Sequence, residues 1–151
     1  MTASHRSRWV HWLYEARKRY DLSVLNYVVT ANHIHLLVRD TGNQAIQKSM
    51  QLIAGRTGQE FNIRKERKGA YWEGRYHATA IDTESHLFRC LVYIDLNMVR
   101  AGVVEHPSHW VVDIMLFKTR QNVIALSIKL HYVSFPESIL LRIIRKIIER
   151  G

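Results

Sequence analysis

The chain has 151 residues, 47% of them hydrophobic and 23% charged, so it is long enough for one domain with a sizeable core. Lysine and arginine outnumber aspartate and glutamate by 22 to 13, and a formal net charge of +9 favours a polyanionic partner such as nucleic acid. The single cysteine, Cys90, excludes an internal disulfide and favours a cytoplasmic location. We expect neither a signal peptide nor a membrane-spanning segment.

The first predicted elements are a helix and a β-hairpin. Residues 7–20 place apolar side chains near helical spacing with basic residues between them, which predicts an amphipathic helix. Residues 22–30 are apolar and β-branched, and residues 33–39 follow a tight connection, so two paired strands are expected. Asp40 to Asn43 then supply turn chemistry and the N-cap of a second helix over residues 43–63.

A basic loop and a third helix follow. Residues 64–69 form the loop, and residues 70–81 predict a strand or an extended pair. Asp82 or Thr83 caps the next helix, which ends at Ala101-Gly102 because glycine favours a helix stop.

Two short segments carry side chains that could bind a metal or act in catalysis. His33 and His35 are two positions apart in a predicted strand, so they share one face. Tyr93 and Asn97 lie one turn apart on one stripe of the third helix. Taken alone, the histidines are as readily a chance surface pair as a metal site. Tyr93 and Asn97 alone are more often a core-edge aromatic and a surface amide.

Together the four side chains can form a divalent-metal site with a nucleophile beside it. Two imidazoles and an amide oxygen allow Mg²⁺ or Mn²⁺, and the histidines by themselves would also accept Zn²⁺. A metal can polarise a scissile phosphate and orient it for in-line attack by Tyr93. On a basic chain, this combination indicates cutting and joining of nucleic acid.

Three segments carry a family resemblance. Residues 28–38, with Asn32-His33-Ile34-His35 at their centre, resemble the HUH motif (histidine, hydrophobic residue, histidine) of single-tyrosine transposases. Residues 72–76 and 93–104 resemble the branch of that family associated with repetitive extragenic palindromes, with Met98 where the branch has proline. The resemblance covers about residues 8–112, and the three motifs occur in the family's order and spacing.

The resemblance implies an α/β (α+β) fold, a ferredoxin-like sandwich with an antiparallel sheet and packed helices. It implies that His33, His35 and Asn97 hold the metal and that Tyr93 is the nucleophile. The family cleaves single-stranded DNA at hairpin ends, leaving a 5′-phosphotyrosine and a free 3′-hydroxyl, and uses no ATP. Its members act as monomers or homodimers, and a bacterial cytoplasmic location is expected.

The expected DNA surface is a basic loop with aromatic residues after it. Cations suit phosphates and rings suit bases in single strands, although a solvated charge run before a core strand explains the same pattern equally well. The candidate DNA-binding residues are Arg64, Lys65, Arg67, Lys68, Trp72 and Arg75.

The chain departs from the family pattern at both ends. Family members begin with another strand of the central sheet, so residues 1–112 are expected to be a catalytic domain that lacks its first strand and leaves an unpaired sheet edge. Residues 113–151 are basic and rich in isoleucine, and our hypothesis is that a frameshift near codon 112 produced them; the neighbouring reading frame tests this. Helical spacing over residues 139–148 predicts an amphipathic helix there.

Three functions remain open from the sequence. The leading one is a transposase-like DNA strand transferase acting through Tyr93. The second is a DNA-binding remnant of a transposase without catalysis. The third is a metal-dependent single-strand nuclease in which water attacks the phosphate and Tyr93 is structural.

Overall fold

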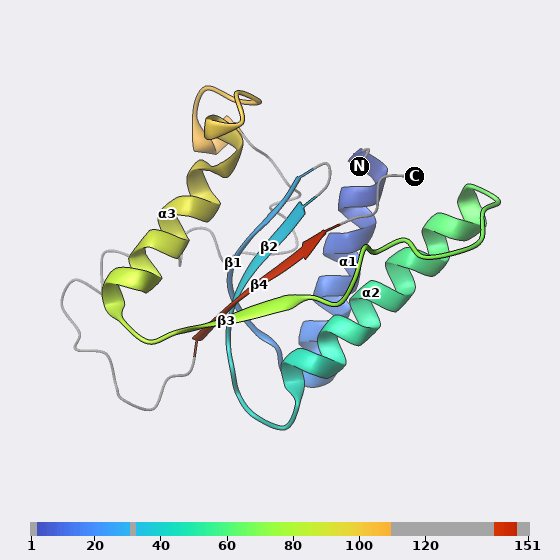
Figure 1. Cartoon of the computed structure of the whole chain (residues 1–151), viewed down its shortest axis with the longest axis horizontal. Coiled ribbons are helices and arrows are strands. Elements are labelled where there is room, and N and C mark those ends of the chain that lie inside the picture. The colour runs from blue at the N-terminus through green and yellow to red at the C-terminus, as the bar shows by residue number, and fades with distance from the viewer. Residues whose placement is uncertain (1–2, 31–32, 110–140, 148–151) are drawn as a thin grey trace.

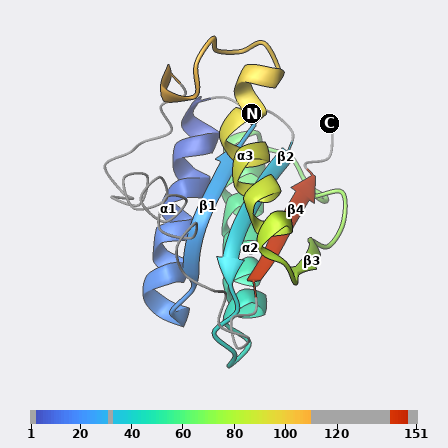
Figure 2. The same ribbon diagram turned by 90° about the vertical axis from the view of Figure 1, so that its left-hand side faces the viewer.

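The computed structural model describes residues 3–30, 33–109 and 141–147, the last segment by its backbone. One sheet lies between a layer of two helices, α1 and α2, and a single helix, α3, on the other face (Figure 1). The sheet has the strand order β1-β2-β4-β3, and each neighbouring pair is antiparallel (Figure 2). The predicted fold class, an α+β sandwich on an antiparallel sheet, is confirmed.

The predicted helix and hairpin at the start of the chain are present. Helix α1 spans Ala3–Tyr20, β1 spans Ser23–Val29 and β2 spans His33–Arg39. Thr30 closes the hairpin: its backbone N–H and its hydroxyl both donate to the carbonyl oxygen of His33, at 2.9 and 3.0 Å. The backbone N–H of His33 donates to the Thr30 hydroxyl oxygen at 2.9 Å, so the start of β2 is fixed by local bonds.

Helix α2 spans Ala45–Arg64, close to the predicted range, but it begins differently. Gln44 is the N-cap residue, with φ of 58°, and no side chain caps the helix. Asp40 instead accepts a hydrogen bond from the backbone N–H of Gly42 at 3.0 Å, which holds the turn. The predicted side-chain cap from Asp40–Asn43 is therefore wrong, because Asp40 is used within the turn itself.

The second half of the described chain contains β3 and α3. Strand β3 is short, His77–Ile81, so only the end of the predicted 70–81 segment is a strand of the sheet. Helix α3 spans Glu84–Arg100, and the predicted cap is confirmed because the Thr83 hydroxyl accepts the N–H of His86 at 3.2 Å. Gly102 follows the helix with φ of +66°, a left-handed conformation suited to glycine, and a 3₁₀ turn at Pro107–His109 comes next.

The helix predicted over residues 139–148 is wrong. Residues Leu141–Ile147 form strand β4, which pairs with β2 on one side and with β3 on the other. Helical spacing was misleading because the segment is also β-branched, and two unfilled strand edges offer its backbone a full set of partners. A missing first strand was expected to leave an unpaired sheet edge. The structure instead places β4 between β2 and β3, where it pairs with the facing edges of both strands.

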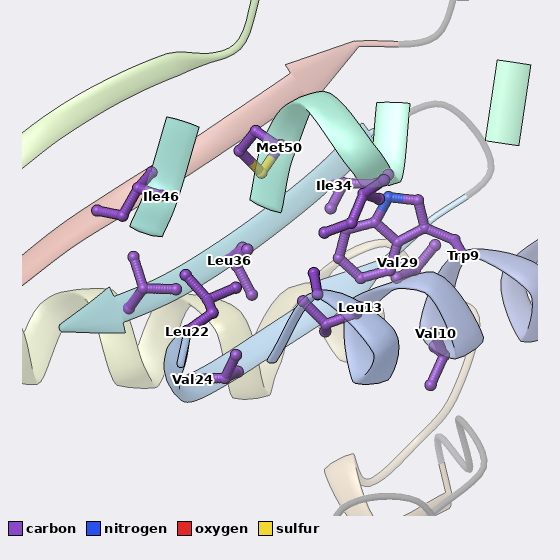
Figure 3. Packing of buried hydrophobic residues seen from close by; sticks show 13 residues of the cluster. Trp9, Val10, Leu13, Leu22, Val24, Val29, Ile34, Leu36, Ile46 and Met50 are labelled. Atoms are coloured by element: carbon purple, nitrogen blue, oxygen red, sulfur yellow. The ribbon is translucent and has the colours of Figure 1, made fainter. Parts of the chain in front are cut away.

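Each face of the sheet has its own hydrophobic core. On one face, α1 and α2 pack on alternate residues of the hairpin, with Trp9, Leu13 and Met50 almost fully buried (Figure 3). On the other face, α3 covers Leu37 and Ile81 through its apolar stripe. The two cores fix the layers independently, so α3 sits on the sheet without contributing to the α1–α2 core.

Glu60 connects the two helices of the first layer. Its carboxylate accepts hydrogen bonds from Nε of Arg8 at 2.7 Å, from Nη2 of the same guanidinium, and from Nε1 of Trp12 at 3.0 Å. The bond from Arg8 is the main reason that the pKa of Glu60 lies below its ordinary value. A charged carboxylate therefore joins α1 to α2 beside the apolar core.

Candidate active site

The hairpin presents both histidines on the sheet face that α3 covers. His35 is 6% exposed and His33 is partly exposed. Their imidazole rings are parallel, with centroids 6.3 Å apart and planes 6° apart. The register Val28↔His35 puts His35 on the same face as the α3 core, because Val28 belongs to that core.

Tyr93 is brought to His35 by the packing of α3. The two ring centroids are 5.1 Å apart and the planes are 87° apart, an edge-on contact. The tyrosine is 39% exposed, so its ring touches the imidazole while part of the side chain faces solvent. The predicted histidine pair and the predicted tyrosine, far apart in the sequence, thus form one cluster.

Asn97 lies one turn after Tyr93 on α3 and is partly exposed. The described part of the chain contains no group of three or more His, Cys, Asp or Glu side chains arranged to hold a metal ion. A metal at His33 and His35 would therefore take its third protein ligand from another type of residue, and the amide of Asn97 is the candidate. Side chains two apart on a strand can turn toward one shared ion, so the two imidazoles fit a divalent cation.

A second potential nucleophile in α3, Cys90, belongs to the core. It is 7% exposed among the apolar residues that pack α3 on the sheet. Burial raises the pKa of its thiol, which disfavours the reactive thiolate. Tyr93, which is partly exposed, is therefore the more accessible of these two side chains.

One polar contact of α3 was not predicted from the sequence. The side-chain amide of Asn26 in β1 donates to Oδ1 of Asp95 at 2.8 Å, and Asn26 is only 9% exposed. The available signal was an asparagine inside an otherwise apolar strand, since buried amides need partners.

The candidate DNA-binding loop lies apart from this cluster. It follows the end of α2, on the side of the molecule away from α3 (Figure 1). Arg64, Lys65 and Lys68 are exposed, as is Arg75. Arg67 is partly buried: it donates to the carbonyl oxygen of Ala70 at 3.0 Å and lies 5.5 Å from the centroid of the Phe61 ring.

The aromatic residues after the loop are anchored to α2. Tyr71 is 7% exposed, lies against Phe61, and burial raises its pKa to about 12. Trp72 donates from Nε1 to the carbonyl oxygen of Ala54 at 2.9 Å and packs against the α1–α2 core. These contacts show that Tyr71 and Trp72 hold the segment in place, whatever ligand the exposed part of Trp72 contacts.

Comparison with known families gives the class of protein to which this fold and this imidazole–tyrosine cluster belong. The model of the family "Transposase IS200 like" matches residues 1–97, about two thirds of the chain, and this range includes both histidines, Tyr93 and Asn97. The chain belongs to the family of IS200-like transposases. Neither a curated protein nor a solved structure matches it significantly.

Membership of this family gives the activity at a coarse level, which is transposase-type strand transfer on DNA. The basic composition agrees with a DNA partner. Within the ranges that the structure covers, no helix is both long enough and apolar enough to cross a membrane.

Proposed function

We propose that this transposase cleaves and rejoins single-stranded hairpin DNA through a covalent bond to Tyr93, as in the branch associated with repetitive extragenic palindromes. The observation that carries the proposal is the edge-on contact of Tyr93 with His35. A tyrosine is a weak nucleophile at its ordinary pKa, and neighbouring groups that can hold a metal at the phosphate would support its attack. The branch is supported by the Trp-Glu-Gly-Arg-Tyr segment and by the sequence from Tyr93 onward.

In the proposed reaction the Tyr93 oxygen bonds to the scissile phosphorus, and the bond from phosphorus to the 3′-oxygen breaks. The phenol loses its proton, and the leaving 3′-oxygen gains one, so the products are a 5′-phosphotyrosine and a free 3′-hydroxyl. Rejoining is the reverse attack by a 3′-hydroxyl on the same phosphorus. One phosphodiester is exchanged for another in each step, so no outside energy source is needed.

His33, His35 and Asn97 would hold a divalent ion, Mg²⁺ or Mn²⁺. Bound there, the ion supplies charge neutralisation at the scissile phosphate. Other parts of the DNA strand, at a distance from the reacting phosphate, would be bound by Arg64, Lys65, Arg67, Lys68, Trp72 and Arg75.

Covalent capture tests the proposal. The protein is incubated with a single-stranded hairpin oligonucleotide and Mn²⁺, denatured, and examined for a protein–DNA adduct. We expect an adduct that is lost in Tyr93→Phe. Tyr14→Phe is the matched control, since Tyr14 on α1 is also 39% exposed, and it should keep the adduct.

The other outcomes identify the alternatives. Cleavage without an adduct, unchanged in Tyr93→Phe, would show that water attacks and that the protein is a nuclease. Binding of the hairpin with neither cleavage nor adduct would identify a DNA-binding remnant. Either result contradicts the proposed strand transfer.

A further inference from the structure

The bond between Asn26 and Asp95 lies on the opposite flank of α3 from the imidazole–tyrosine cluster. Successive residues of a helix are about 100° apart, so Tyr93 and Asp95 project on either side of Ile94. Ile94 is 2% exposed and packs on the sheet. Helix α3 therefore rests on Ile94, touches β2 through Tyr93, and is tied to β1 through Asp95.

A β-bulge in β1 turns Asn26 toward α3. Val24 pairs with Val38, but the next pair is Asn26 with Leu37, which leaves Leu25 as the extra residue. Leu37 belongs to the core under α3, whereas Val24 and Val38 belong to the α1–α2 core. In a regular strand continuing from Val24, position 26 would face α1 and α2 like Val24, because residues two apart in a strand face the same side.

The asparagine is itself held in place. Its Oδ1 accepts the backbone N–H of Tyr27 at 2.8 Å, which leaves Nδ2 directed at Oδ1 of Asp95. A fixed amide that donates to a carboxylate makes a stronger and more directional bond than two neutral groups would.

We propose that Asn26 and Asp95 are positioning residues that set the rotation of α3 about its own axis, and thereby the distance between Tyr93 and His35. With side chains, a helix has a radius of about 5–6 Å, so a roll of roughly 20° moves a side chain at its surface by about 2 Å. A misplacement of about 1 Å at a reacting group can cost about 100-fold in rate. The expected effect on the reaction rate rests on the proposed function of Tyr93.

A swap of the two side chains tests the inference. Asn26→Asp puts two carboxylates face to face and should push the Asp95 flank away from β1. Asp95→Asn alone keeps an acceptor oxygen opposite the Asn26 amide, so it should weaken the bond without breaking it and change both readouts less than Asn26→Asp does. The double variant places an aspartate in β1, which still accepts the Tyr27 N–H, opposite an asparagine in α3, and so restores the bond in reverse.

Two measurements are made on each variant. The first is the rate of adduct formation on hairpin DNA with Mn²⁺, normalised to folded protein, together with DNA affinity. We expect the rate to fall by about tenfold or more in Asn26→Asp, with affinity changed by less than about twofold, and to recover in the double variant. The second is the NMR shift of the His35 ring protons, without metal or DNA, which reports the neighbouring Tyr93 ring.

The Tyr93→Leu variant gives the His35 shift without the tyrosine ring. In Asn26→Asp the His35 shift should move toward that value, and in the double variant it should return to the wild-type value. If Asn26→Asp does not fold, Asp95→Ala removes the same bond from an exposed position and should change both readouts in the same direction. An unchanged rate and unchanged His35 shift, or a defect that the swap does not repair, would overturn the inference. A wild type that forms no adduct, with His35 shifts that follow the swap, would instead overturn only the proposed function.

Discussion

Replacing Glu60 by glutamine measures how strongly α1 is joined to α2. The carboxylate accepts two bonds from the Arg8 guanidinium and one from Nε1 of Trp12. Glutamine has nearly the same size, but it has no charge and only one acceptor oxygen. The substitution therefore removes the ion pair and at least one hydrogen bond without opening a cavity.

The expected loss follows from the exposure of the pair. The Arg8 and Glu60 side chains are 49% and 25% exposed, so water screens part of their attraction. Exposed ion pairs contribute about 0–1 kcal/mol, and hydrogen bonds to charged groups about 1.5–3 kcal/mol. We expect Glu60→Gln to lower the free energy of unfolding by about 1 kcal/mol, which corresponds to roughly 2–4 °C in Tm for a domain of this size.

The loss should depend on pH in a definite direction. The hydrogen bond from Arg8 is the main cause that lowers the pKa of Glu60 below its ordinary value of 4.5. A carboxyl with a lowered pKa in the folded state stabilises the fold above its unfolded pKa, and loses that contribution as the pH falls through its folded pKa. The difference between wild type and Glu60→Gln should therefore be constant above about pH 6 and shrink below about pH 4.5.

Urea unfolding followed by tryptophan fluorescence at pH 7 and pH 3.5 checks this. The matched control is Glu15→Gln, because Glu15 pairs with Arg19 one turn away on the same helix at 3.1 Å. That exposed pair should contribute at most about 0.5 kcal/mol. Equal losses in the two variants, or a Glu60→Gln loss that is the same at both pH values, would refute the assignment of Glu60 as the link between the helices.

Two further variants test the α2 region. Gly55→Ala should stabilise the protein by about 0.5–1 kcal/mol in the same assay, since an added Cβ meets no atom within 4 Å in this helix interior; a destabilised variant would contradict this. Changing Arg64, Lys65 and Lys68 to glutamine should weaken binding of single-stranded DNA and reduce the slope of log affinity against log salt by up to about two units. The same change at Lys18, an exposed α1 cation, should leave that slope nearly unchanged if the loop is the DNA surface.

Local patterns predicted most of the first hundred residues. The hairpin followed from β-branched residues around a tight turn, and its second strand has the predicted bounds, His33–Arg39. The α3 helix followed from a Thr83 cap, an apolar stripe and a terminal glycine. These features depend on residues within one or two turns of each other, so the sequence alone contains the information.

The features that the sequence did not predict depend on distant partners. Strand β4 has a helix-like spacing, and only the edges of β2 and β3 make it a strand. The link from Asn26 to Asp95 needs both a bulge in β1 and the docking of α3, which local periodicity cannot report. The candidate site was predicted in part because its two halves carry motifs, although their contact is set by the packing of α3.

The central place of β4 has a consequence for how the protein is made. Among the strands that the structure describes, β3 pairs only with β4, and β4 is encoded about sixty residues later. While the ribosome is still translating those residues, the edge of β2 that later pairs with β4 has an exposed row of backbone groups, which is a template for pairing with other chains. Closing the sheet by such a long-range contact is slow, so nascent copies are expected to be most vulnerable to aggregation until β4 has been made and has paired.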